Sequence, residues 1–214
     1  MKPLTSLLLL LTILVSCKQT PKIPTDFDYG KTENNIYTNK YFDFEFPVPP
    51  TWVIQDKDQV KQLNQEGQKM LAEKNKTLAD QIKASEVSSA TLLVVFRNKT
   101  DTVTGEFNHS FTVIAENLRG ITSVKKGEDY LKQAKMLMQK SNMAYSFPNE
   151  MYTTKLGNHE FDAMDVIMTI QGMDVHQTYY ATIEKGFALS AIASYGTNEQ
   201  KKEIADVLDG FRFH

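Results

Sequence analysis

The sequence predicts an α+β fold in which an antiparallel sheet is sandwiched by helices. Residues 56–84 and 128–141 carry apolar residues at roughly helical spacing. Short apolar or alternating runs, separated by polar turns, have the pattern of strands. The last of these strand-like runs are joined by turns that contain glycine, and a helix with a capping residue comes after them. We therefore expect one domain over residues 40–214, long enough to bury a substantial core.

The first strand of this domain is expected at residues 41–46. Phe42, Phe44 and Phe46 alternate with acidic residues there, which is the period of a half-buried strand. Prolines end this run, and a second strand starts at Trp52. We expect Trp52 to be buried at the start of that strand; the alternative is an exposed aromatic ridge that binds a partner.

The middle of the chain is expected to hold two helical regions separated by two strands. Residues 56–84 should form two helical pieces, because Gly67 weakens the middle of their apolar stripe. Two apolar strands then follow at residues 91–97 and 110–117, joined by a polar loop. Residues 128–141 read as an amphipathic helix. The stripe over 56–84 either docks a partner or, as we expect, covers the protein's own sheet.

The C-terminal third is expected to be an antiparallel meander with turns at residues 157–158, 172–173 and 184–186. A two-residue second loop with Gly172 first pairs Ile170 with Val175 and Val166 with Tyr179. These apolar residues then share one face. Polar residues, including Asp165 opposite Tyr180, share the other face.

The third turn of the meander offers two registers. A two-residue loop pairs Glu184 with Phe187 and places apolar side chains on opposite faces. A three-residue loop pairs Ile183 with Phe187 and keeps them on one face, so we expect the three-residue loop.

The last helix is expected to begin at Thr197, which has capping-box spacing to Gln200. It should end at Gly210 in a left-handed conformation, with Phe211 packing back on the helix.

The N-terminus has the features of an export signal. Lys2 precedes an apolar run from Leu4 to Val15, which is shorter than the roughly 20 apolar residues of a membrane-spanning helix. The run ends in Leu-Val-Ser followed by Cys17, the only cysteine. This ending resembles the lipobox of bacterial lipoproteins, in which the peptide is cut before a cysteine whose sulfur carries a diacylglycerol. A secretory signal with an incidental thiol is the alternative.

This resemblance divides the chain into a signal peptide, a lipidated tether and the domain over residues 40–214. Residues 1–16 are the expected signal peptide, and residues 17–39 are the lipidated Cys17 and a flexible tether that reaches at most roughly 70 Å. Lys18 after Cys17, in place of an aspartate, favours the outer membrane, with the domain in the periplasm. The net charge of -2 becomes about -3 after cleavage and argues against nucleic-acid binding.

Two stretches resemble the PsbP-like fold, which photosystem extrinsic proteins and bacterial DcrB-like lipoproteins share. "YFDFEFPVPPTW" is similar to that family's first strand, proline turn and tryptophan. "GFALSAIASYGTNEQKKEIADVLDGFRF" is similar to its last strand and helix. The resemblance implies a domain that binds other proteins, and it implies no catalytic or metal-binding residue of this chain.

No catalytic or cofactor-binding motif is present in the sequence. The four histidines lack metal-ligand spacing, there is no second cysteine, and no P-loop, GxSxG or GxGxxG occurs. Most of the nine methionines lie between residues 136 and 173, which allows a soft-metal site, but core filling is the better interpretation. We therefore expect neither a metal nor a cofactor.

The polar face of the meander is the candidate ligand site, with Asp165, His176 and Tyr180 as its members. The plainer interpretation is a solvated or helix-covered face, because alternation alone produces one. The function expected overall is that of a lipid-anchored binding or scaffold protein of the cell envelope that contacts another envelope protein. The alternatives are an envelope enzyme or a small-ligand carrier that uses this polar face.

Overall fold

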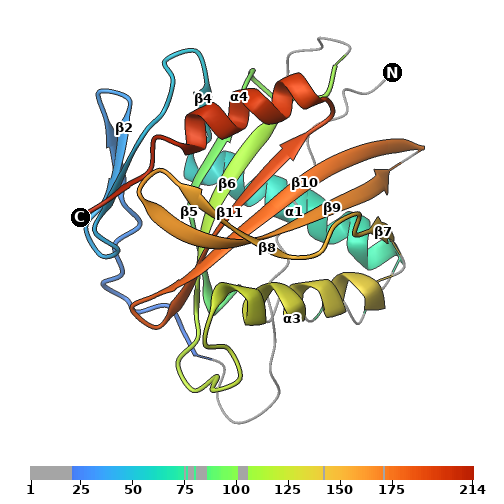
Figure 1. The fold of residues 1–214 in the computed structure, drawn as a ribbon, viewed down its shortest axis with the longest axis horizontal. Coiled ribbons are helices and arrows are strands. Elements are labelled where there is room, and N and C mark those ends of the chain that lie inside the picture. Colours follow the sequence, from blue (N-terminus) through green and yellow to red (C-terminus); the bar gives the residue numbers. More distant parts are fainter. Residues whose placement is uncertain are drawn as a thin grey trace.

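The structure, a computed structural model, describes residues 21–214 except residues 75, 77–79, 81–85, 101–105, 142 and 171. The predicted α+β class with an antiparallel sheet between helices is confirmed in this part of the chain. The larger sheet has eight strands in the order β4-β5-β6-β11-β10-β9-β7, with β8 also paired to β9. A second sheet has four strands in the order β1-β2-β3-β12. Figure 1 shows α4 in front of the larger sheet and α1 behind it.

The described elements have the following bounds. The smaller sheet contains β1 (Lys31–Glu33), β2 (Ile36–Asn39), β3 (Phe44–Pro47) and β12 (Arg212–Phe213). The larger sheet contains β4 (Val53–Ile54), β5 (Ser89–Phe96), β6 (Ser110–Asn117), β7 (Ala144–Ser146), β8 (Tyr152–Leu156), β9 (His159–Ile170), β10 (Met173–Glu184) and β11 (Phe187–Tyr195). The helices are α1 (Lys57–Lys74), α3 (Gly127–Lys140) and α4 (Asn198–Leu208).

The central strand β11 is buried on both of its faces. All nine of its residues are buried, and it lies between β6 and β10. Ala188 and Ile192 belong to one apolar core, whereas Leu189 and Ala191 belong to the other. The larger sheet therefore separates two cores, and each of its faces needs a cover.

Helices α3 and α1 cover the first face. Leu131 and Met138 of α3 pack into one core with Met164 and Met168 of β9. These methionines are buried, as expected for core filling. Leu63 of α1 packs farther along this face, against Val94 and Phe96 of β5.

The smaller sheet and α4 cover the second face. Phe46 of β3 packs on Phe211, which follows α4, with 4.6 Å between the ring centroids. Ile204 and Leu208 of α4 are buried in the same core. The expected alternation of residues 41–46 is confirmed by the burial of Phe42, Phe44 and Phe46. The strand itself starts only at Phe44, because Asp43 has a φ of 60°.

The prediction of a flexible tether up to residue 39 is wrong for residues 21–39. These residues contain β1 and β2, and Phe27, Tyr37 and Asn39 are buried. The aromatic ring of Phe27 lies 5.3 Å from that of Phe187 on the central strand. The polar, proline-containing composition concealed this role, because isolated aromatic residues show no periodicity. Residues 1–20, with Cys17, lie outside the described part, and no described helix is long and apolar enough to cross a membrane.

The prediction that Gly67 divides the first helix is also wrong. α1 continues through Gly67 to Lys74, and Gly67 is buried. The intrinsic cost of a helical glycine, about 1 kcal/mol, is small enough for tertiary packing to override it. Most of the second helical piece expected up to residue 84 falls outside the described residues. The strands at 91–97 and 110–117 and the helix at 128–141 are confirmed within a few residues.

The two registers predicted for the meander are both incorrect. Met164, not Val166, lies opposite Tyr179, so β9 and β10 are displaced by two residues from the expected pairing. A shift of two residues keeps every side chain on its face, so the polarity pattern could not detect it. Thr178, not Tyr180, therefore lies opposite Asp165.

The third turn is the two-residue loop that the sequence argument rejected. Glu184 pairs with Phe187, and Lys185 and Gly186 have φ values of 51° and 82°. Positive φ at both central residues is typical of a type I′ turn. The rejection assumed that only one face of the meander is apolar, whereas both faces of β11 are buried.

The C-terminal helix starts as predicted and ends differently. The side chain of Thr197 accepts a hydrogen bond from the backbone N–H of Gln200, as expected. The C-cap residue is Asp209, and Gly210 is not left-handed. A Cβ atom at Gly210 would lie only 2.7 Å from Cγ of Pro47, so glycine is needed there for close packing against β3. Phe211 is buried, as predicted.

Replacing Phe27 with alanine should lower the free energy of unfolding by about 3 kcal/mol, because this ring fills a core that the central strand lines. Urea unfolding measures the change. The matched control is Lys31→Ala, an exposed change in the same segment, which should stay within about 0.5 kcal/mol of the parent protein. Equal, small effects for both variants would show that residues 21–39 do not contribute to the fold.

Candidate functional site

A large cavity lies at one end of the larger sheet, where three connections meet. β5 ends just before Arg97, β6 begins just after His109, and Gly196 and Thr197 link β11 to α4. The cavity has a volume of about 820 Å³. Its lining residues are Arg97, Asn98, Glu106, Phe107, His109, Gly196, Thr197, Glu199, Gln200 and Glu203.

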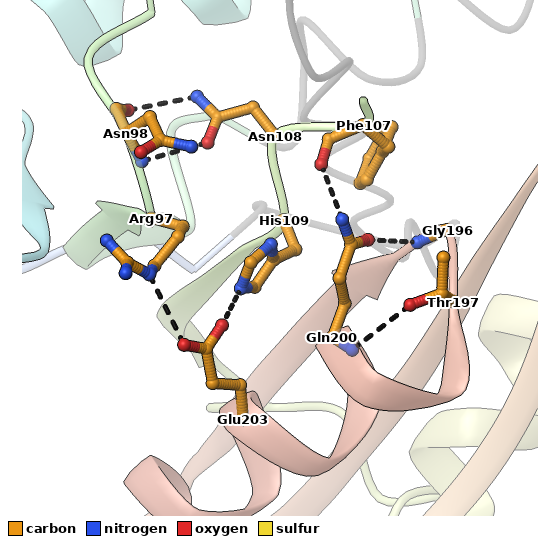
Figure 2. Close-up of polar contacts among 9 residues, drawn as sticks. All are labelled: Arg97, Asn98, Phe107, Asn108, His109, Gly196, Thr197, Gln200 and Glu203. Atoms are coloured by element: carbon orange, nitrogen blue, oxygen red, sulfur yellow. Dashed lines mark hydrogen bonds and ion pairs between the residues drawn. The ribbon is translucent and has the colours of Figure 1, made fainter. Parts of the chain in front are cut away.

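Two buried amide side chains hold the walls of this cavity in place. Asn108 accepts a hydrogen bond from the backbone N–H of Asn98 and donates one to its carbonyl oxygen, both at 2.9 Å. The Gln200 side chain donates to the carbonyl oxygen of Phe107 at 2.9 Å and accepts from the N–H of Gly196 at 2.8 Å. Figure 2 shows how these bonds connect the ends of β5 and β6 to the start of α4. The walls are therefore fixed by paired polar groups.

A histidine, a glutamate and an arginine meet at the floor of the cavity. Nε2 of His109 lies 2.6 Å from one carboxylate oxygen of Glu203, and Nε of Arg97 donates to the other oxygen at 3.3 Å (Figure 2). The His109 side chain is 7% exposed, whereas that of Glu203 is 48% exposed. The Trp52 and His109 rings pack in a T-shaped arrangement, with 5.3 Å between the ring centroids. Trp52 is buried, as expected.

Burial lowers the pKa of His109 below its ordinary value, although the hydrogen bond to Glu203 opposes this shift. The neutral imidazole can still donate Nε2–H to the carboxylate. Its other nitrogen, Nδ1, is enclosed and has no hydrogen-bond partner in the part of the chain that the structure describes. One nitrogen is thus occupied and the other is shielded, so neither is placed to accept a proton from a substrate in the cavity.

The three predicted ligand-site residues, Asp165, His176 and Tyr180, lie on one face of the meander. Each of them contacts a different set of neighbouring residues. Oδ1 of Asp165 accepts a hydrogen bond from Thr178 at 2.8 Å, and Oδ2 accepts one from Asn149 at 2.9 Å. The hydroxyl of Tyr152 lies 3.4 Å from Oδ1. Nζ of Lys201 on α4 is 3.9 Å from the same oxygen. Asp165 therefore connects several segments.

Tyr180 belongs to this cluster, whereas His176 joins it indirectly. Burial raises the pKa of Tyr180 to about 12, and the nearby Tyr195 and Asp165 contribute to this rise. The His176 ring stacks on that of Tyr195 at 5.7 Å. The Tyr195 hydroxyl lies 3.2 Å from that of Thr178. The structure thus brings Asp165 and Tyr180 together and places His176 at the margin.

No group of three or more histidine, cysteine, aspartate or glutamate residues in the described part of the chain is arranged to hold a metal ion. Three of the histidines contact other side chains instead. His109 bonds to Glu203, Nε2 of His159 lies 2.9 Å from Glu184, and His176 stacks on Tyr195.

The sequence argument missed the cavity around His109. Its two principal residues are 94 positions apart, and neither belongs to a motif. The one usable signal was the capping pair Thr197 and Gln200, which located the start of α4. It did not indicate that Gln200 also holds the loop before β6.

No protein-family model matches the chain, and no curated protein matches it significantly. Among solved structures, it is similar to a cyanobacterial PsbP (CyanoP) from Synechocystis sp. PCC 6803, with 12% identity, 84% of this chain and 91% of that chain covered, and a TM-score of 0.49. It is similar to LpqN from Mycobacterium tuberculosis, described as involved in cell envelope biogenesis, with 11% identity, 78% and 79% covered, and a TM-score of 0.42. A protein from Bacteroides thetaiotaomicron shows 10% identity, 80% and 45% covered, and a TM-score of 0.42.

The pKa of His109, followed by NMR titration of its imidazole, should lie below the ordinary value of about 6.5. Glu203→Gln should lower it further because a charge that favours the protonated ring is lost. Arg97→Gln should raise it because a repelling cation is lost. An unchanged midpoint in both variants would contradict this electrostatic account.

The lowered pKa of His109 also makes the stability of the fold depend on pH. The folded protein binds the His109 proton more weakly than the unfolded chain does, so the free energy of unfolding should fall as the pH drops below about 6.5. His109→Gln should remove this part of the pH dependence, which denaturation at several pH values measures.

Thr178→Val should lower the free energy of unfolding by about 1 to 3 kcal/mol, because the Asp165 carboxylate loses a buried donor while the side-chain shape is kept. Thr153→Val is the control. It removes a comparable hydrogen bond, to Asp162, at an exposed position, and should change stability by less than about 0.5 kcal/mol. Equal losses for both variants would argue against a structural role for the Asp165 cluster.

Proposed function

We propose that the protein is a lipid-anchored binding protein of the bacterial cell envelope, and that the cavity around His109 and Glu203 receives a segment of another envelope protein. The observation that carries the proposal is this open cavity, which is lined mainly by charged and amide side chains, several of which bond to one another or to the backbone. The anchor is the diacylated Cys17 at the end of the signal sequence. The expected location is the periplasmic face of the outer membrane.

The composition of the cavity favours a protein segment over a small apolar ligand. Small-molecule pockets of this size are lined mainly by apolar and aromatic residues. Among the described residues that line it, Phe107 is the single aromatic side chain apart from the imidazole, and charged or amide side chains dominate. Polar groups at a rim, with arginine among them, are common where proteins bind one another.

The chemistry of the cavity favours binding over catalysis. Both carboxylate oxygens of Glu203 face donors, from His109 and from Arg97. The amide of Gln200 uses its donor and its acceptor on the backbone. Groups that already satisfy one another give a fixed surface that a partner can match without a cost of reorganisation.

Growth with labelled palmitate tests the anchor. The parent protein should carry the label and sediment with membranes, because several acyl chains hold firmly where one binds only marginally. Cys17→Ala should lose the label and leave the membrane fraction. An unlabelled parent protein, with unchanged fractionation of the variant, would remove the lipid anchor from the proposal.

A photo-crosslinking residue tests the partner site in living cells. Placed at Glu199 on the rim of the cavity, it should form one defined adduct with an envelope protein. Placed at Lys155, which is exposed on β8 away from the cavity, it should not. Arg97→Glu should abolish the adduct at position 199 without unfolding the protein. Adducts of equal yield at both positions would contradict a specific site.

A small-ligand carrier or an enzyme on the polar face of the meander is the second candidate. The observation in its favour is the ring of hydroxyl groups from Tyr152, Thr178 and Tyr195 near Asp165. Native mass spectrometry of the purified protein should then reveal a bound compound that is lost when Asp165, His176 and Tyr180 are replaced together. An identical mass for both proteins would exclude a retained ligand at this site.

A further inference from the structure

A second cavity lies at the opposite end of β6 from the His109 site. Its volume is about 420 Å³, and it lies between the loop after β6 and the turn between β10 and β11. We call it the basal groove. Its lining includes the apolar side chains of Leu118, Ile121, Val124, Ile183 and Phe187.

Among the described residues that line the basal groove, the charged side chains are both cations, Arg119 and Lys185, and none is a carboxylate. Both cations are exposed. The ion pairs found among the described residues do not include Arg119, and the ammonium of Lys185 donates to the carbonyl oxygen of Tyr41 at 2.6 Å. Asp26 and Glu86 occur on neighbouring segments, so the cationic character belongs to the groove and not to the whole end of the domain.

The N-terminal segment joins the domain beside this groove. The Asn117 side chain donates to the carbonyl oxygen of Lys22 at 2.8 Å, and the N–H of Ile23 donates to the carbonyl oxygen of Val87 at 3.0 Å. Asn117 and Pro24 both line the groove. In Figure 1 the first described residues, in dark blue, reach the lower edge of the molecule, near the turn between β10 and β11.

The short chain between the anchor and this attachment point limits the orientation of the domain. Cys17 and Lys22 are five residues apart, so even a fully extended chain places Lys22 within about 18 Å of the lipidated sulfur. β6 has eight residues and extends about 25 Å from Asn117 to the His109 end. The basal groove is therefore the cavity that can reach the bilayer surface while the His109 cavity points away from it.

We propose that the basal groove binds the headgroup of an anionic phospholipid in the membrane that holds the anchor. Arg119 and Lys185 contact the phosphate, and the apolar floor receives the upper part of an acyl chain. This inference rests on the lipid anchor of the proposed function. Cations near an anionic leaflet are each attracted to its surface potential, so two of them on one groove favour a single orientation.

The test uses the full-length lipidated protein bound to liposomes of phosphatidylcholine, with and without phosphatidylglycerol. A fluorophore is attached through Thr122→Cys beside the groove or, in a separate protein, through Asn198→Cys at the start of α4. A headgroup nitroxide lipid should quench the label at 122 several-fold more than the label at 198. Phosphatidylglycerol should increase this difference.

Charge reversal separates headgroup recognition from the anchor. Arg119→Glu with Lys185→Glu should abolish the increase that phosphatidylglycerol causes, while flotation with the liposomes stays unchanged. Lys132→Glu with Lys202→Glu, which reverses the same charge on α3 and α4, should keep the increase. Thermal unfolding of each variant confirms that it is folded.

The unfavourable outcomes are distinct. Equal quenching of both labels on a protein that floats overturns the inference and leaves the lipid anchor intact. Quenching at position 122 that is unchanged by phosphatidylglycerol and by charge reversal also overturns the inference. The short chain between Cys17 and Lys22 alone would then set the orientation. Quenching that depends on the density of protein on the liposomes, together with crosslinked dimers, would mean that the groove binds a second copy of the protein. That result also overturns the inference. A parent protein that does not float removes the anchor itself.

Discussion

The burial of β11 on both faces is the constraint on which the rest of this structure depends. A strand in the middle of a sheet can bury both faces only if a layer covers each of them. α3 and α1 provide one layer, and α4 with the smaller sheet provides the other. The smaller sheet needs β1 and β2, so residues that lack any strand pattern in the sequence become part of a core.

The same constraint builds the cavity around His109. Because α4 must lie across the second face, its first turns pass the end where β5 stops and β6 starts. Glu203 then reaches His109 and Arg97, and Gln200 reaches the backbone of Phe107. The polar groups that the helix brings to this end pair with polar groups from the ends of β5 and β6.

The two ends of β6 differ in chemistry, which is consistent with the proposed lipid anchor. Near Asn117 the chain leads toward Cys17, and the adjacent groove combines cations with apolar side chains. Near His109 the cavity is mainly polar and lies about a strand's length away. An attachment at one end of a rigid sheet would present the other end to soluble or membrane-bound partners.

Sequence alone determined the elements whose signals are local. Helical stripes, alternating phenylalanines, the Thr197 cap and the apolar leader that ends at Cys17 are each read from neighbouring residues. Of these, α3, the buried phenylalanines and the cap of α4 appear where expected. Tertiary structure decided the registers of the meander, the role of residues 21–39 and the contact between His109 and Glu203. The physical reason is that a two-residue slip preserves the polarity of each face, and that contacts between distant residues leave no periodic trace in the chain.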